Sequence, residues 1–312
     1  MEVNKLGIII DQTMFDNKDD GININGPCLI KVPSFIKNPL GKYYCYFAHH
    51  AGKYIRLAYS DKIEGPYKIY KNGTLHIKDT TGFNHIASPD VHIDYNKQQI
   101  IMYYHCPYNN NITPQSTLSA ISSDGLNFIS NNNNIIYPYF RKFTYNNIEY
   151  GLAMKKDFKK HNTTEIPYFG LSWKSAPATN QKSVTAVLKK VNNNWIEIGN
   201  ILPFSRHACI MITDKIYILY TTVGDNPEHI QICELLINRN NIQTNNSKKF
   251  IEPDTEYEYD NIHSKPSVYG VTYDNVKELR DPYIFNENSN YYLLYTIGGE
   301  KGIAIAKINI NC

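Results

Sequence analysis

The sequence lacks the features that would place it in a membrane or on a nucleic acid. It has no uninterrupted apolar run long enough to span a bilayer. Its net charge of +3 is too small, for 312 residues, to predict binding to a nucleic acid or an anionic membrane. The first residues hold a short apolar stretch followed by acids, which is not the pattern of a secretion signal. We therefore expect a cytoplasmic protein with neither a membrane nor a nucleic acid as partner.

Common catalytic and metal motifs are also missing. We find no GxSxG elbow, no P-loop, no GxGxxG after a strand and no HExxH. These absences argue against elbow-type serine hydrolases, P-loop nucleotide hydrolases and zincin metalloproteases. The six cysteines are scattered without a CxxC pair, mostly in apolar strand-like runs where a free thiol behaves as a small hydrophobe. This usage predicts a reducing compartment, no cofactor and no bound metal.

Helical periodicity is missing as well, whereas strand periodicity is abundant. No window of a dozen residues shows a helical stripe, and the periodic stretches are short and alternate with period two. The chain contains 26 tyrosines, and tyrosine is enriched in strands. With 42% apolar and 20% charged residues, the composition is that of a soluble globular protein. These patterns predict an all-β protein.

The strand-like stretches recur in five similar groups of about four, the last of which has only three. Such radial repetition predicts a five-bladed β-propeller of four-stranded antiparallel blades, forming a single domain over residues 1–312. The N-terminal stretch LGIII would supply the missing strand and close the ring. A β-sandwich would also give short strands but would not repeat their order. The stretches are 26–36, 42–50, 54–61 and 65–70; 88–94, 98–106, 116–124 and 126–130; 137–143, 148–154, 168–175 and a fourth within 184–198; 206–212, 215–222, 229–237 and 248–253; and 280–286, 290–297 and 302–309.

Propeller geometry selects two places per blade that face a central pocket, the start of the first strand and the end of the second. Charged and imidazole side chains gather at these places in several blades, which favours a functional pocket over chance. The starts are Gly26-Pro27, Ser88-Pro89-Asp90, Tyr139-Phe140-Arg141, Arg206-His207 and 278–282, and the ends are His49-His50, His105, Lys155-Lys156, Thr221-Thr222 and Glu300.

The motifs SPDV in the second blade, RDP in the fifth and YIRLAYSDKIEGPY in the first resemble those of the five-bladed propeller glycoside hydrolases of families 43 and 117 and their uncharacterised bacterial relatives. In family 43 the first three blades supply an aspartate base, an orienting aspartate and a glutamate acid. Asp90 matches the second of these, whereas the first position reads Gly26-Pro27 and the third offers Arg141. In family 117 a histidine is the proposed acid. Some relatives hold a divalent ion in the central channel, and no pattern here locates one.

From these positions we predict a glycoside hydrolase that acts on a glycan or oligosaccharide, with Asp90 and Glu278 as catalytic carboxylates and His207 as an alternative acid. Structural readings stay open, because Asp90 could cap a turn, Asp281 could brace a blade and His207 could be a buried hydrogen-bonded histidine. Adjacent strand residues face opposite sides, so only one of His49 and His50 should point inward. Substrate-binding roles are predicted for His49, His50, His92, His105, Arg141, Arg206, Arg280, Asp281 and Glu300.

Two further expectations concern the ligand. Arg141, Arg206 and Arg280 begin three adjacent blades, which predicts a surplus of positive charge and an acidic sugar as substrate, with inter-blade salt bridges as the alternative. The missing carboxylate at Gly26 favours a second hypothesis, a non-catalytic carbohydrate-binding propeller. The number of carboxylates that converge on the pocket distinguishes the two. The sugar, the linkage and the oligomeric state are not predicted.

Overall fold

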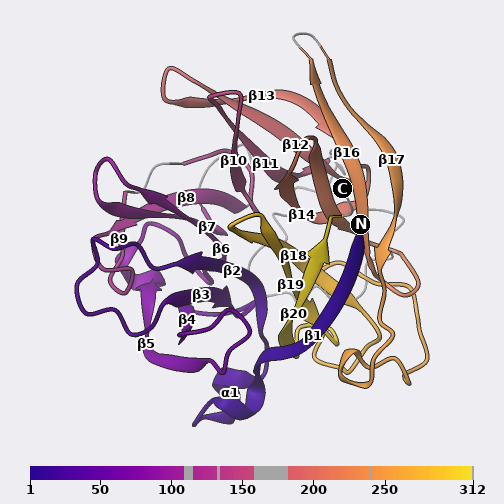
Figure 1. Ribbon diagram of the computed structural model, residues 1–312, viewed down its shortest axis with the longest axis horizontal. Helices are drawn as coiled ribbons and strands as arrows, with labels where there is room; N and C mark the ends of the chain where they lie inside the picture. Colours follow the sequence, from indigo (N-terminus) through magenta and orange to yellow (C-terminus); the bar gives the residue numbers. More distant parts are fainter. Residues whose placement is uncertain (109–114, 132–133, 158–181, 239–240, 311–312) are drawn as a thin grey trace, which may run out of the picture.

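The computed structural model describes residues 1–312 except 109–114, 132–133, 158–181, 239–240 and 311–312. Five four-stranded antiparallel sheets stand in a ring (Figure 1). From the innermost strand outwards, the blades are β2 (Asn25–Lys31), β3 (Tyr43–Ala48), β4 (Tyr54–Ser60), β5 (Lys68–His76); β6 (Ala87–Asp94), β7 (Gln99–Pro107), β8 (Gln115–Ser122), β9 (Ile129–Ser130); β10 (Arg141–Tyr145), β11 (Ile148–Asp157), β12 (Lys182–Val191), β13 (Asn194–Ile201); β14 (Ser205–Ile212), β15 (Ile216–Thr222), β16 (Ile230–Asn238), β17 (Asn241–Ile251); and β18 (Leu279–Glu287), β19 (Asn290–Ile297), β20 (Gly302–Asn309), β1 (Glu2–Asp11).

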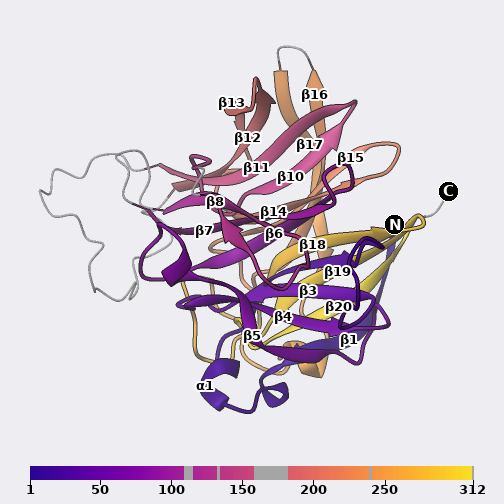
Figure 2. The same ribbon diagram turned by 90° about the vertical axis from the view of Figure 1, so that its left-hand side faces the viewer.

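The predicted closure of the ring by the N-terminal strand is confirmed. β1 pairs antiparallel with β20, from Glu2 opposite Asn309 to Asp11 opposite Gly302. The two strands lie side by side in both views (Figures 1 and 2). The N-terminal strand thus becomes the outermost strand of the C-terminal blade, and its apolar end, Ile9 and Ile10, is buried.

Among the described residues, helical structure is confined to short pieces between strands. They are η1 (Gln12–Met14), α1 (Lys18–Gly21), η2 (Ile77–Asp79) and η4 (Glu256–Glu258). Across the described ranges, no helix is long and apolar enough to span a membrane.

The third blade corrects one prediction. Its third strand is β12, Lys182–Val191, and its fourth is β13, Asn194–Ile201, so the sheet is complete without the stretch 168–175 that we predicted as a strand. That stretch lies outside the described residues. The weak strand expected within 184–198 is two strands joined by a tight hairpin at Asn192-Asn193, whose φ angles of 48° and 65° suit the type of turn that asparagine favours.

The core lies between the blades because each sheet buries side chains on both faces. Tyr44 and Tyr46 of the first blade, for example, belong to one apolar cluster with Met102 and Tyr104 of the second. Similar clusters join the other neighbouring blades. The five described cysteines are buried and free, as expected of small hydrophobes.

Truncation of a core side chain should cost much more stability than the same kind of change at the surface. Leu294 of β19 is fully buried in the cluster that joins the fifth blade to the first. We expect Leu294→Ala to lower the free energy of unfolding by about 2–5 kcal/mol, because the removed atoms leave a cavity. Ile196→Ala, at a side chain that is 47% exposed, should change it by roughly 0.5 kcal/mol or less. Urea unfolding of both variants measures this, and equal losses would contradict the packing described above.

Candidate active site

The first strands of four blades carry the same irregularity where they begin. The pairing register shifts between Asn25 and Cys28, Ala87 and Asp90, Ser205 and Ala208, and Arg280 and Tyr283. Within three of these bulges one residue has a positive φ: Gly26 (59°), Ser88 (49°) and Asp281 (51°). Bulges re-aim side chains and concentrate near active sites. The repeated bulge therefore marks one rim of the channel, which we call the mouth.

The mouth encloses a small polar cavity. Its volume is about 10 Å³, which corresponds to roughly one water molecule. Aromatic rings surround it in succession, with centroids 6.5 Å apart for His50 and His85, 6.0 Å for His85 and His105, 4.2 Å for His105 and Tyr139, and 4.1 Å for Tyr139 and His207. The lining residues are Asn25, His50, His85, Ala87, Ser88, His105, Tyr139, His207 and Glu300. Four predicted site residues, His50, His105, His207 and Glu300, thus meet in one cavity.

His207 is held by Asp281, and its second ring nitrogen is left toward the cavity. Nδ1 bonds to Oδ1 of Asp281, while Oδ2 accepts the backbone N–H of Gly26 (3.1 Å) and the hydroxyl of Thr296 (3.2 Å). A carboxylate accepts, so we assign the ring proton to Nδ1 and leave Nε2 as an acceptor. No described residue bonds to this nitrogen or to Nδ1 of His105. Burial lowers the pKa of both histidines well below 6.5, so both rings are neutral. Nε2 of His207 is an acceptor, whereas Nδ1 of His105 accepts or donates according to the tautomer of that ring.

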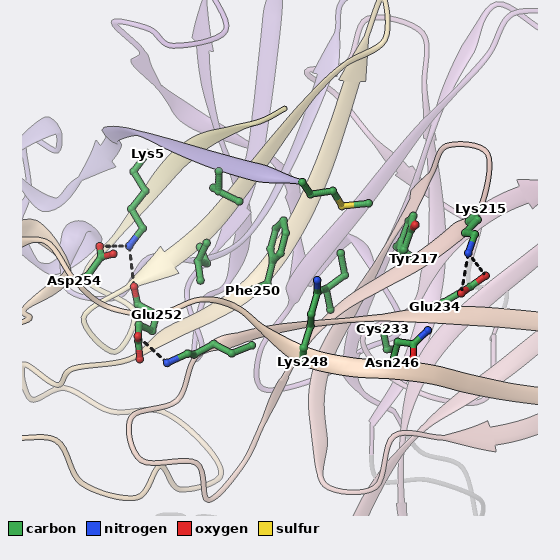
Figure 3. Close-up of a pocket in the computed structure, with 15 residues that line it drawn as sticks. Lys5, Lys215, Tyr217, Cys233, Glu234, Asn246, Lys248, Phe250, Glu252 and Asp254 are labelled. Atoms are coloured by element: carbon green, nitrogen blue, oxygen red, sulfur yellow. Dashed lines mark hydrogen bonds and ion pairs between the residues drawn. The ribbon is translucent and has the colours of Figure 1, made fainter. Parts of the chain in front are cut away.

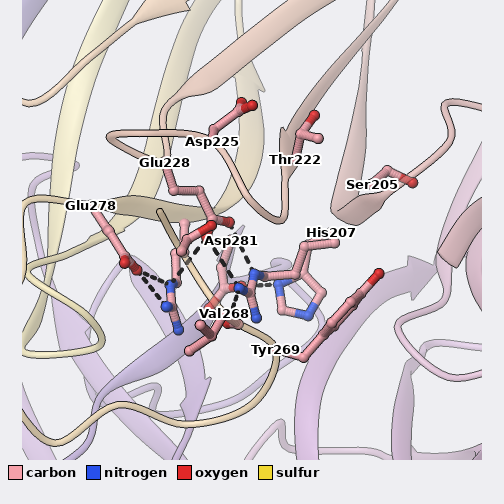
Figure 4. Close-up of polar contacts among 12 residues, drawn as sticks. Ser205, His207, Thr222, Asp225, Glu228, Val268, Tyr269, Glu278 and Asp281 are labelled. Carbon is pink, nitrogen blue, oxygen red and sulfur yellow. Dashed lines mark hydrogen bonds and ion pairs between the residues drawn. The ribbon is translucent and has the colours of Figure 1, made fainter. Parts of the chain in front are cut away.

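Beside the cavity, two arginines and three glutamates form a buried network. Figure 4 shows two of its glutamates, Glu228 and Glu278, with His207 and Asp281 close by. Arg206 binds Glu228 with two parallel bonds, from Nε to Oε1 (2.9 Å) and from Nη2 to Oε2 (3.1 Å). Arg280 donates from Nε to Oε2 of Glu278 (2.8 Å) and from Nη1 to Oε1 of Glu300 (3.5 Å). One guanidinium therefore bridges Glu278 and Glu300.

The three carboxyl groups of this network have different proton affinities. Burial raises the pKa of Glu278, and the Glu228 carboxylate raises it further, against the opposing effect of Arg280. For Glu300, His50, Arg280 and Asn23 outweigh the effect of burial and hold the pKa at about 2. Burial is likewise outweighed at Glu228, whose pKa is lowered by Arg206 and Arg280. Glu278 is thus the group best suited to carry a proton, and Glu300 the one best suited to stay ionised.

The stability of the fold should depend on the charge of Glu300 at low pH. Its pKa in the folded state, about 2, lies below its ordinary value of 4.5, so its stabilising effect is full above pH 4.5 and is lost as the pH falls towards 2. The difference in free energy of unfolding between wild type and Glu300→Gln should therefore shrink between about pH 5 and pH 3. Urea unfolding at several pH values measures it, and a constant difference would contradict the ionised pairing.

The structure contradicts the expected surplus of positive charge. Arg206 and Arg280 are matched by Glu228, Glu278 and Glu300, and Arg141 lies 3.8 Å from Asp90. Carboxylates therefore outnumber guanidinium groups around the channel. The alternative of inter-blade salt bridges holds instead, because Arg280 of the fifth blade also lies 3.6 Å from Glu228 of the fourth.

Asp90 and Glu278 have different partners. Its Oδ2 accepts from the His92 ring (2.7 Å) and from the Lys142 backbone (2.8 Å), and these contacts with Arg141 outweigh burial and lower its pKa. With His92 and Arg141 it lines a different cavity, of about 220 Å³. Among the described residues, Asp90 and Glu278 share no hydrogen-bond or ion-pair partner. The two carboxylates that we had assigned to one reaction thus have different surroundings, and their joint role stays a prediction.

Only one of the adjacent residues His49 and His50 was expected to point inward. His50 lines the cavity and His49 does not, since Nδ1 of His49 accepts the N–H of Ala51 in its own turn (2.9 Å).

Two residues near the mouth were not predicted from the sequence. His85 was overlooked because it precedes its blade rather than beginning it. Glu228 lies in the turn into the third strand of its blade, which faces the mouth, so the same geometric rule extended to that turn would have found it.

A larger cavity, of about 740 Å³, lies between the outer strands of the fourth and fifth blades and contains none of the predicted site residues (Figure 3). Most of its cations are already paired, Lys5 with Glu258 (2.6 Å) and Lys215 with Glu234 (3.3 Å), for example. In the part of the chain that the structure describes, no group of three metal-ligating side chains is arranged to hold an ion. The expected absence of a metal remains a prediction.

The fold is similar to that of several solved glycoside hydrolase structures, among them enzymes of family 43. A β-xylosidase/α-arabinofuranosidase from a compost metagenome has a TM-score of 0.60 at 12% identity, covering 99% of this chain and 96% of that one. A thermostable family 43 enzyme has a TM-score of 0.63 at 11% identity (93% and 90% covered), and a putative glycoside hydrolase from Bacteroides ovatus 0.63 at 12% (99% and 97%). At these identities the likeness shows a shared fold, the five-bladed propeller of family 43.

In sequence, the chain is 31% identical to uncharacterized protein R118 of Acanthamoeba polyphaga mimivirus over 316 residues, which cover 93% of this chain and 85% of that protein. It belongs to the same protein family as R118. No protein-family model matches the chain.

Proposed function

We propose that the protein is a glycoside hydrolase whose active site is the mouth of the channel. The observation that carries the proposal is the pair of carboxyl groups bridged by Arg280, one with a raised and one with a lowered pKa. Glycosidic cleavage needs an acid to protonate the leaving oxygen and a base or nucleophile on the other side of the anomeric carbon. Glu278 takes the first role and Glu300 the second, and the proposed reaction does not use Asp90.

His207 and His105 offer ring nitrogens to sugar hydroxyl groups at the mouth. His207 Nε2 and His105 Nδ1 are buried at the cavity and face no donor among the described residues. A ligand hydroxyl would satisfy either nitrogen, and an unsatisfied buried acceptor costs about 1–3 kcal/mol. His207 is therefore proposed as a substrate acceptor rather than as an acid, because its pKa is lowered. Asp281 is a positioning residue that holds this ring.

The cavity at the mouth is too small to hold a sugar ring. A volume of about 10 Å³ holds a water molecule or an inserted hydroxyl, so the sugar ring must bind over the mouth. Glu278 is 3% exposed and does not line this cavity, so neighbouring residues must move before a glycosidic oxygen can reach it.

The charge of the site gives no advantage to an acidic sugar, because Glu228, Glu300 and Asp90 offset the three arginines even when Glu278 carries its proton. Among the family 43 neighbours, one structure contains xylotriose and another xylose. Pentosides are therefore the first substrates to test.

The test measures hydrolysis and binding together. Nitrophenyl xylosides, arabinofuranosides and glucuronides, followed by a glycan library, are offered to wild type and to Glu278→Gln. We expect hydrolysis of a neutral glycoside by wild type and its loss in the variant. Binding of a glycan without its cleavage would instead establish the non-catalytic carbohydrate-binding propeller.

A further inference from the structure

A further pocket lies on the first blade, beside the short segment that links β1 to β2. Its volume is about 440 Å³, and it shares no lining residue with the cavity at the mouth. Phe15, Tyr54 and Tyr70 contribute aromatic surface to it, and Arg56 and Lys68 contribute positive charge. In the ribbon, this link and α1 lie at the outer end of the first blade, near β5 (Figures 1 and 2).

Arg56 differs from the other buried arginines in its partners. Arg141, Arg206 and Arg280 each lie within 3.8 Å of a carboxylate oxygen. Arg56 is only 4% exposed, yet no described carboxylate forms an ion pair with it. Its Nη1 donates to the Asn23 carbonyl (2.8 Å), and its guanidinium lies 5.2 Å from the Phe15 ring centroid and 5.9 Å from that of Phe47.

The carboxylates near Arg56 are engaged elsewhere. Asp20 accepts the Tyr54 hydroxyl (3.2 Å), and Asp16 pairs with Lys71. Burial lowers the pKa of Arg56, and Tyr54 and Asp20 oppose that shift only in part. Three cations and two carboxylates line the pocket, namely Arg56, Lys68 and Lys71 against Asp16 and Asp20.

A buried guanidinium without an anion is costly, because the loss of its hydration is not compensated by an opposite charge. Two cation–π contacts offset part of this cost. The carbonyl of Asn23 and the side chain of Tyr54 engage some of the five N–H donors. The guanidinium thus retains donors suited to the planar oxygens of a carboxylate or a phosphate. The flanking aromatic side chains suit the apolar face of a sugar ring.

We propose that this pocket binds a monosaccharide that bears a carboxylate or a phosphate group. The anion meets Arg56 at the buried end, with Lys68 at the rim as the second cation, and the ring packs against Tyr54 and Tyr70. The site is separate from the proposed active site, and the inference holds whether or not the mouth hydrolyses glycosides.

Calorimetric titration of the full chain with glucuronate, glucose 6-phosphate and glucose, at one ionic strength, tests the site. We expect at least one of the two anions to bind about tenfold or more tightly than glucose. Glucuronate alone would identify the anion as a carboxylate, and glucose 6-phosphate alone as a phosphate. No binding of either anion, or equal binding of glucose, would overturn the proposal.

Three variants test whether the anionic sugar binds in this pocket. Lys68→Glu reverses an exposed charge at the rim and should weaken anion binding about tenfold, without loss of the fold. Arg56→Met should abolish it, and Lys97→Glu, the matched charge reversal at an exposed turn outside the pocket, should leave it unchanged. If Lys68→Glu binds the anion as wild type does, the site lies elsewhere and the proposal fails, even if Arg56→Met does not fold.

Discussion

Glu278→Gln should lower kcat/KM for a glycoside with a poor leaving group by about 10²–10⁴-fold, the usual contribution of a general acid. Glutamine has nearly the shape of glutamic acid and can still face Arg280, but it cannot deliver a proton to the departing oxygen. Because burial and Glu228 raise the pKa of Glu278, the wild-type group keeps its proton to higher pH than an ordinary glutamate does. Initial rates on one substrate series measure the loss.

The leaving group separates loss of the acid from general damage. A dinitrophenyl glycoside departs with little need of a proton, so the variant should lose much less activity on it than on an alkyl glycoside. Glu64→Gln, at an exposed position, is the matched control and should behave as wild type on both. Equal losses of Glu278→Gln on both substrates, with the melting temperature unchanged, would remove Glu278 from the acid role.

Glu228→Gln should lower the free energy of unfolding by about 3–5 kcal/mol, because it leaves buried arginine charge without its counter-ion. Glu228 is fully buried, holds Arg206 through two bonds and lies 3.6 Å from Arg280. These contacts join the start of β14, the turn before β16 and the start of β18. Denaturant unfolding with a constant m-value measures the change.

The matched control for this substitution is Glu252→Gln. Glu252 is paired with Lys249 at 2.7 Å, with side chains 44% and 54% exposed, so its loss should cost roughly 0–1 kcal/mol. If Glu228→Gln cost no more than Glu252→Gln, the buried network would not brace the blades.

The sequence predicted the fold because the propeller repeats its signals. Five groups of alternating residues gave the blades and their order, and the three-stranded last group predicted the closing role of β1. The third blade was misread because a run rich in aromatic residues at 168–175 resembles a strand more than Lys182–Val191 does. The hairpin at Asn192-Asn193 was visible in the sequence but was absorbed into one long weak strand.

The sequence predicted which strand starts and ends lie at the mouth, but not which side chain of each start lines the cavity. The rule on strand starts and ends brought His50, His105, His207 and Glu300 to one cavity. It did not distinguish Ser88 from Asp90, which begin the same strand. The bulge sends Ser88 to the mouth, while Asp90 faces the separate cavity, and bulges arise from tertiary packing that no local pattern records.

The pairing of the buried arginines with carboxylates was predicted from the sequence only as an alternative. Arg206 and Glu228 are 22 positions apart, and only the folded chain sets their two parallel bonds. Because the sequence does not show these partners, the arginines at three blade starts predicted a positive pocket and an acidic ligand. Gly26 stands at the position where family 43 enzymes carry a base. Its backbone N–H donates to Asp281 instead. The proposed chemistry therefore relies on the fifth blade.

The most direct test of the proposed chemistry is cleavage of a glycan library in water enriched in heavy oxygen, followed by mass spectrometry. The account predicts that wild type releases a sugar carrying one heavy oxygen from a neutral glycan, and that Glu278→Gln and Glu300→Gln, both folded, bind that glycan but do not cleave it. Undiminished cleavage by either variant, or binding without cleavage by wild type, would contradict it.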